Sequence, residues 1–243
     1  MTATRRYVVH GSKLLSRRGY RMVAYDARGH GESAAPEDRS AYEYADLAGD
    51  LGAVLDDRGV DHCVLAGHSM GAATAIRFAL DHPERVAALV QITPAYDGER
   101  DEEDLADWEK LADGLASNGV DGFMEAYDPA IKGDFRDTVL KFTRQRLERH
   151  RDPQAVADAL RVVPGSHAFD GLEALQSVDA PTLVVASRDD ADPGHPCKVA
   201  EAYSEYLPNA ELIIEDEGRS PIAWQGAQLS GAIADFLERE QLR

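Results

Sequence analysis

Residues 63–73, with the sequence CVLAGHSMGAA, contain the pattern that decides the fold of this chain. A short apolar run ends at Gly67, and the residues from Met70 onward have a helical pattern that stops before Pro83. A strand that turns sharply into a helix needs small residues two positions before and two positions after the residue at its apex. The Gly-x-Ser-x-Gly spacing therefore predicts a strand, a tight turn with Ser69 at its apex, and a helix.

Similar apolar runs bounded by turn residues recur along the chain, and they are typical of strands buried on both faces of a parallel sheet. The five candidate strands are residues 20–25, 62–66, 86–92, 181–186 and 211–214. Helical stretches separate these runs. The alternation predicts an α/β protein with a mostly parallel, doubly wound sheet.

Two helix starts carry clear sequence signals. Residues 40–43 (SAYE) have a capping-box pattern ahead of Leu47, Leu51 and Leu55, and they predict the first long helix. Ser220 as cap and Pro221 at the first helical position predict the start of the last helix.

One long segment breaks the alternation of strand and helix. Residues 97–178 are acidic at the start and helical in pattern, with no convincing strand before residue 181. We therefore expect a core formed by residues 1–96 and 179–243, with residues 97–178 as a helical insertion. An insertion at the carboxyl edge of such a sheet can act as a lid over a ligand site, although helices that only pack fit the same pattern.

The charge balance excludes several kinds of partner. The 243 residues include 26 Lys plus Arg and 44 Asp plus Glu, a formal net charge of −18. Nucleic acid and anionic membranes are therefore poor partners, and a small molecule is the expected ligand. No run of about 18 apolar residues occurs, and the two cysteines are isolated, so we expect a soluble, cytoplasmic protein with no metal and no cofactor. The oligomeric state stays open.

Three motifs together resemble the α/β-hydrolase superfamily, in its esterase, lactonase and C–C hydrolase branch. They are residues 25–33 (YDARGHGES), residues 67–71 (GHSMG) and Thr93-Pro94. The resemblance extends from about residue 19 to residue 236. It implies a serine hydrolase in which Ser69 attacks a small ester, lactone or related carbonyl compound, and in which the Met70 amide donates to the oxyanion.

The resemblance also implies an acid after the strand that follows the insertion. Asp192 fits because Pro193 follows it and Pro196 lies four residues after it. Counting from the start of the strand favours Asp190 instead, as if the loop carried two extra residues. We expect Asp192 to be the acid and keep Asp190 as the alternative; an Asp that only caps a turn is common before Pro and Gly.

The residue expected to act as the base is absent from its usual place. The family places a histidine between the last strand and the last helix, where this chain has Arg219. Arginine stays protonated in proteins and cannot serve as the general base. Among the eight histidines, His195 is the best placed substitute, although a loop histidine without a catalytic role is the commoner case.

The front of the chain departs from the family in a second way. Residues 8–11 (VVHG) resemble the segment that supplies a second oxyanion donor, here the amide of Ser12 or its neighbour. The connection to residue 19 is short, so either the reading frame starts late or the N-terminal edge strands are lost. We expect these strands to be missing and the second donor to be doubtful. The alternative function is therefore a catalytically inactive protein of the same fold that binds a small molecule or a protein partner.

Overall fold

The computed structural model describes residues 1–99, 102–128, 135–188, 192, 194–215 and 224–242. Its centre is a parallel sheet in the order β1-β2-β3-β4. The strands are β1 (Cys63–His68), β2 (Val86–Ile92), β3 (Thr182–Ala186) and β4 (Ala210–Ile214). The register pairs His68 with Ile92 and Ile92 with Val185, so the carboxyl ends of these strands meet at one edge of the sheet.

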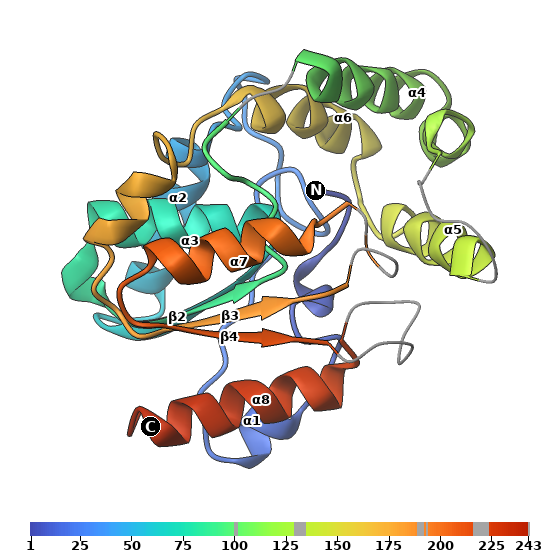
Figure 1. Cartoon of the computed structure of the whole chain (residues 1–243). Coiled ribbons are helices and arrows are strands. Elements are labelled where there is room, and N and C mark those ends of the chain that lie inside the picture. The colour runs from blue at the N-terminus through green and yellow to red at the C-terminus, as the bar shows by residue number, and fades with distance from the viewer. Residues whose placement is uncertain (100–101, 129–134, 189–191, 193, 216–223, 243) are drawn as a thin grey trace.

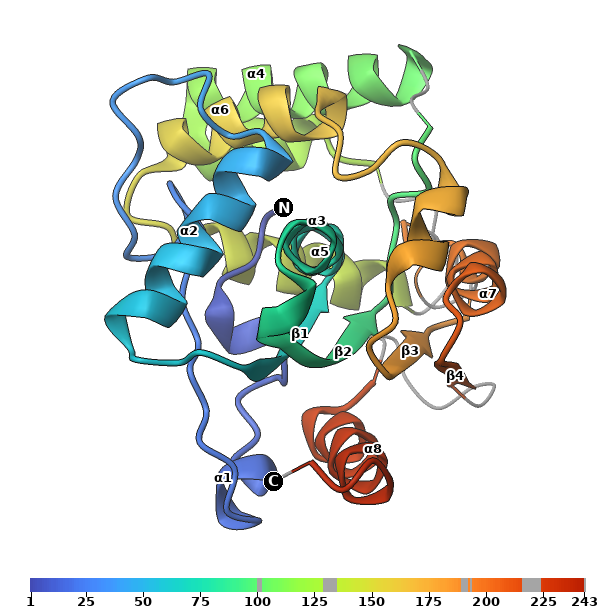
Figure 2. The same cartoon turned by 90° about the vertical axis from the view of Figure 1, so that its left-hand side faces the viewer.

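Helices cover both faces of the sheet (Figures 1 and 2). One face carries α2 (Tyr44–Asp57), α3 (Met70–Asp81) and α7 (Cys197–Tyr206), and the other carries α8 (Gly226–Arg239) with the short α1 (Leu14–Arg17). Alternate strand residues separate accordingly: Leu89 packs in the cluster around α2 and α3, and Val90 packs against α8. The α/β, doubly wound architecture predicted from the sequence is confirmed.

Three long helices lie between β2 and β3 in the chain. They are α4 (Glu102–Ala126), α5 (Phe135–Leu147) and α6 (Pro153–Val162). We call residues 97–178 the helical insertion. It has a small core of its own that includes Leu115, Phe123 and Leu160. Figure 1 shows α4 and α6 stacked above the sheet and its helices, and α5 beyond the carboxyl ends of β3 and β4.

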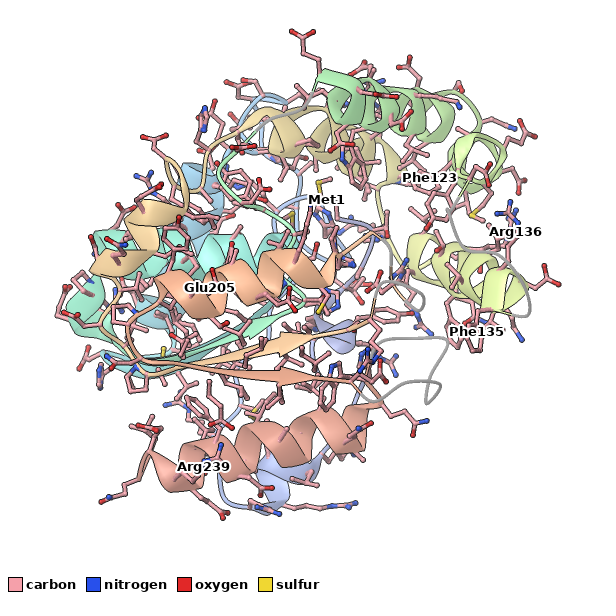
Figure 3. The ribbon with its side chains drawn as sticks, in the orientation of Figure 1. Met1, Phe123, Phe135, Arg136, Glu205 and Arg239 are labelled. Atoms are coloured by element: carbon pink, nitrogen blue, oxygen red, sulfur yellow. The ribbon has the colours of Figure 1, made fainter. Side chains whose placement is uncertain are left out.

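A sharp bend divides α4 into two helical segments. Asn118 and Gly119 have non-helical backbone angles there, and Gly119 has φ +59°. The two segments approach closely at Gly114 and Gly122, where a Cβ on either glycine would collide with the backbone of the other. The second segment is thereby folded back, and Phe123 lies where α4 approaches α5 (Figure 3).

The predicted strand at residues 20–25 is wrong, since these residues have no assigned secondary structure. A strand needs a neighbour to complete its hydrogen bonds. Here a cavity lined by residues 19–25 on one side and residues 60–65 on the other separates this segment from the free edge of β1. Met22 and Val23 are consequently exposed by 45% and 40%.

Both predicted helix starts need correction. The cap of α2 is Glu43, whose amide donates to Asp46, whereas Ser40 donates to Asp38 instead. The last helix begins at Gly226, because Trp224 adopts a left-handed backbone conformation (φ +48°) just before the cap. Ser220 and Pro221 lie outside the described residues. Among the helices that the structure describes, none is long and apolar enough to cross a bilayer.

Candidate active site

Ser69 lies at the apex of a strained turn between β1 and α3. Its backbone has φ +53° and ψ −114°, a conformation that L-residues seldom adopt. The Ser69 amide donates to the Ile92 carbonyl at 3.0 Å, and its carbonyl accepts from the Ala72 amide at 2.9 Å. The turn is thus held by the sheet on one side and by the helix on the other, and it presents the Ser69 hydroxyl at the carboxyl edge of the sheet.

The two glycines of the motif differ in what they contribute. A Cβ at Gly67 would collide with the backbone of Gly71, so the turn needs a glycine there. A Cβ at Gly71 would meet nothing within 4 Å. The expected need for a small residue is therefore confirmed at Gly67, whereas in the described surroundings of Gly71 nothing requires it.

The Met70 amide is placed to donate into the site. Met70 is the first residue of α3, and amides of the first helical turn have no acceptor within the helix. The partial positive charge of the helix N-terminus adds to this donor. A negatively charged oxygen formed next to Ser69 can therefore be stabilised from the backbone.

Asp192 and His195 form a hydrogen-bonded pair on the loop after β3. The Asp192 Oδ2 lies 2.8 Å from Nδ1 of His195, and both side chains are about four-fifths buried. Burial acts to raise the pKa of the Asp192 carboxyl, but the charge and hydrogen bond of His195 outweigh it and lower this pKa below its ordinary value. The ionised Asp192 accepts the Nδ1 proton, and this leaves the Nε2 lone pair of His195 free to accept one.

A second histidine lies beside this pair. The rings of His68 and His195 are 5.3 Å apart and perpendicular, at 78°. Burial, with the charge of His195 next, lowers the pKa of His68 to about 3, so His68 is neutral at physiological pH. Its Nε2 lies 3.1 Å from the Thr93 hydroxyl at the end of β2. This places His195 next to the turn that carries Ser69.

One cavity of about 2100 Å³ joins these groups. Its walls include Ser69, Met70, His68, Asp192 and His195, together with side chains of α4 and α5. A second arm of the cavity follows the free edge of β1. Met1 also lines it, between the helical insertion and α3, and packs against the clusters of both (Figure 3).

The structure does not bring every predicted residue to the site. The Ser12 amide donates to the Val9 carbonyl at 2.9 Å, and Ser12 is absent from the cavity wall, so it supplies no oxyanion donor here. Asp190 and Arg219 lie outside the described residues. In the described ranges, no three His, Cys, Asp or Glu side chains are arranged to hold a metal ion.

Sequence reasoning missed two residues that line this cavity. His10 was one of the eight histidines considered as a base and was ranked below His195, yet it lies in the cavity wall, and burial followed by the charge of Arg146 lowers its pKa. Arg146 of α5 was not considered at all. Its signal was present, since residues 139, 142, 143 and 146 have the spacing of one helix face, and all four line the cavity.

The parallel sheet and the strained Ser69 turn define a protein of the hydrolase-fold class. The chain belongs to the α/β hydrolase fold family, whose sequence profile matches residues 6–225.

The relatives include hydrolases of several kinds. The chain is 28% identical to a putative carbamate hydrolase, RutD, of Variovorax paradoxus over 91% of this chain and 82% of that protein. It is 43% identical to epoxide hydrolase 2 of Siraitia grosvenorii over 35% of this chain and 27% of that protein. A thermophilic esterase of Thermogutta terrifontis has the same fold, with a TM-score of 0.81 at 23% identity over 98% of this chain and 86% of that one.

Proposed function

We propose that this protein is a serine hydrolase that cleaves a small ester, lactone or related carbonyl compound, with Ser69 as the nucleophile. The observation that carries the proposal is that Ser69 and the Asp192–His195 pair line one cavity, with Nε2 of His195 unpaired among the described residues. A nucleophilic serine needs a nearby base that a third group orients. Here the third group is Asp192.

The proposed reaction proceeds in two steps. In the first, His195 Nε2 takes the proton of the Ser69 hydroxyl as its oxygen bonds to the substrate carbonyl, and the Met70 amide stabilises the oxyanion. The protonated His195 then gives this proton to the leaving oxygen, which departs as an alcohol. In the second, His195 activates a water molecule that releases the acid and restores Ser69.

His195 replaces the histidine that the family carries at the position of Arg219. It lies three residues after the proposed acid, and not after the last strand. The triad has formed on unrelated folds in several chain orders, so its geometry counts for more than its order. The hydrolytic activities named for the relatives are consistent with this reaction class.

Residues 1–96 and 179–243 would form the catalytic core in this proposal, and residues 97–178 would form the lid. Side chains of α4 and α5 contribute to the wall of the cavity that holds Ser69. Contacts from such an insertion select the substrate, while the turn at Ser69 supplies the chemistry.

The second candidate is an inactive ligand-binding protein. It is favoured by the engagement of the Ser12 amide with Val9, which leaves the predicted second oxyanion donor occupied. Loss of one such donor commonly costs about two to three orders of magnitude in rate.

Labelling with a fluorophosphonate separates the two candidates, because this probe reacts only with an activated serine. We expect intact-mass spectrometry to find one adduct on the wild type and on Ser16→Ala, which changes an exposed serine of α1. We expect no adduct on Ser69→Ala. A wild type without adduct would favour the inactive protein, and an adduct on Ser69→Ala would exclude Ser69 as the nucleophile. A label gained only by Arg219→His would mean that His195 does not act as the base.

A further inference from the structure

We propose that the compound bound in this cavity carries a carboxylate, and that Arg146 of α5 holds it. The carboxylate defines the substrate class of the proposed hydrolase, and this part of the inference rests on the proposed reaction at Ser69. The binding itself can be measured without turnover.

Arg146 lies on the face of α5 that forms the cavity wall. Val139, Phe142, Thr143 and Arg146 recur at helical spacing, and all four line the cavity. A cation on an otherwise apolar or hydroxyl-bearing face of a helix needs a partner or water, because burial of an unpaired charge is unfavourable. Figure 1 shows α5 facing the carboxyl ends of β3 and β4, the edge where Asp192 and His195 follow β3.

Arg146 differs from the other partly buried arginines of the described chain. Each of the others has a carboxylate within 4.0 Å; these are Arg28, Arg77, Arg85, Arg136, Arg144 and Arg161. Arg146 alone in this set makes no ion pair, although Asp and Glu outnumber Lys and Arg by 44 to 26 in the sequence. Arg146 therefore lines the cavity without a carboxylate partner among the described residues.

The hydrogen-bonding capacity of Arg146 is also only partly used among the described residues. Its Nη2 donates to the Thr143 hydroxyl at 3.1 Å, and its Nε is buried with no hydrogen-bond partner. A guanidinium carries five N–H donors in a planar fork that fits both oxygens of a carboxylate. A carboxylate entering the cavity would therefore satisfy donors that the protein leaves open.

The charge of Arg146 acts on groups at the proposed reaction centre. After burial and His195, it is among the charges that set the pKa of Asp192, and after burial it lowers the pKa of His10. His10, Arg146 and Asp192 all line the same cavity. A bound carboxylate would then lie in the same cavity as Ser69, at the end bounded by α5. The nearby Asp192 disfavours a ligand with more than one negative charge there.

Isothermal calorimetry with Ser69→Ala protein tests this inference, because the variant can bind a substrate without cleaving it. The probes are monomethyl glutarate, which carries one carboxylate, and dimethyl glutarate, which is neutral. We expect the monoester to bind about tenfold to a hundredfold more tightly than the diester, because a hydrogen-bonded pair of opposite charges contributes binding free energy of this size. Equal affinities, or no binding of the monoester at millimolar concentrations, would overturn the inference.

Two further variants assign the preference to Arg146. In Ser69→Ala protein, Arg146→Gln should abolish the preference and leave the diester affinity unchanged, and Arg146→Lys should keep part of it. Lys141→Gln removes an exposed charge from the same helix and should change nothing. A preference that survives Arg146→Gln would contradict the inference. If the wild type takes no fluorophosphonate but the preference holds, the proposed hydrolase fails and the carboxylate site stands.

Discussion

Two pairs of histidines in this molecule have nearly the same ring geometry and opposite surroundings. The rings of His30 and His150 are 5.4 Å apart at 77°, and those of His68 and His195 are 5.3 Å apart at 78°. In the first pair, Nδ1 of His150 accepts from the Gly31 amide and its Nε2 donates to the Thr2 carbonyl. Both ring nitrogens of His30 likewise face backbone carbonyls, of Arg28 and Met1.

In the second pair, His68 and His195, one ring nitrogen has no hydrogen-bond partner among the described residues. His195 uses Nδ1 for Asp192, and its Nε2 has no partner in the described part of the chain. The pair lines the cavity with Ser69, whereas neither His30 nor His150 does. A histidine whose nitrogens are all engaged by backbone serves packing, and one with a free, oriented nitrogen can transfer a proton. Ring contact alone therefore does not mark a functional histidine.

The largest expected effect is that of His195→Gln on the reactivity of Ser69. Loss of the general base should slow fluorophosphonate labelling at least about a thousandfold, as removal of such a group commonly does. Labelling rates measured by intact mass test this, with thermal unfolding as a check on folding. His150→Gln is the matched control, and its folded fraction should label at the wild-type rate. Equal rates for His195→Gln and wild type would remove the functional distinction between the pairs.

Asp192→Asn is expected to have the next largest effect. The Asn amide group can donate to Nδ1, which would place the ring proton on Nε2 and remove the base. We expect labelling to slow at least about a hundredfold, within the range that general acid–base catalysis contributes, with little change in melting temperature. As control, Asp152→Asn makes the same substitution at the helix cap of α6, where Asn caps about as well as Asp, and should retain both the stability and the labelling rate. An Asp192→Asn protein that labels normally would show that His195 needs no orienting carboxylate.

A substitution in the His30–His150 pair should change the stability of the protein and leave the reactivity of Ser69 unchanged. His150→Leu leaves the buried Gly31 amide without its acceptor and the partly buried Thr2 carbonyl without its donor. We expect a loss of about 2–3 kcal/mol in the free energy of unfolding, measured by urea titration. The labelling rate of the folded fraction should not change. A variant as stable as wild type would mean that these hydrogen bonds contribute nothing net.

The parts of the fold that depend only on residues close to one another in the sequence were predictable from the sequence. The Ser69 turn follows from Gly67 and the flanking strand and helix, all within a few residues. The segment 20–25 has the same local pattern as the true strands, but a strand also needs a partner, and the cavity beside β1 leaves it none. Local patterns therefore predicted the elements, while pairing at the edge of the sheet could not be read from them.

The same limit applied to the candidate site. The spacing of Asp192 and His195 allows their contact within one turn of chain, so both could be proposed from sequence. The roles of His30 and His150 could not, because the Gly31 amide and its acceptor are 119 residues apart. Arg146 was missed for a related reason: its helix was evident, but which face lined a cavity depended on the position of α5.

The smallest effect, a change in how stability depends on pH, is expected for His30, the most deeply buried histidine among the described residues. Burial lowers the pKa of His30 to about 4, against an ordinary value of about 6.5. Below a pH of about 6.5, His30 is protonated in the unfolded chain but stays neutral in the folded protein. The protein therefore has its full stability above this pH and loses stability progressively as the pH falls toward 4. The loss is at most about 1.4 kcal/mol for each pH unit.

His30→Gln should reduce the slope of stability against pH by this amount in urea titrations between pH 7 and 5, whatever its stability at pH 7. His68→Gln should act in the same direction, because burial also lowers the pKa of His68, to about 3. If neither substitution alters the slope, the two rings are not held neutral by the fold, and the acid sensitivity of the protein arises elsewhere.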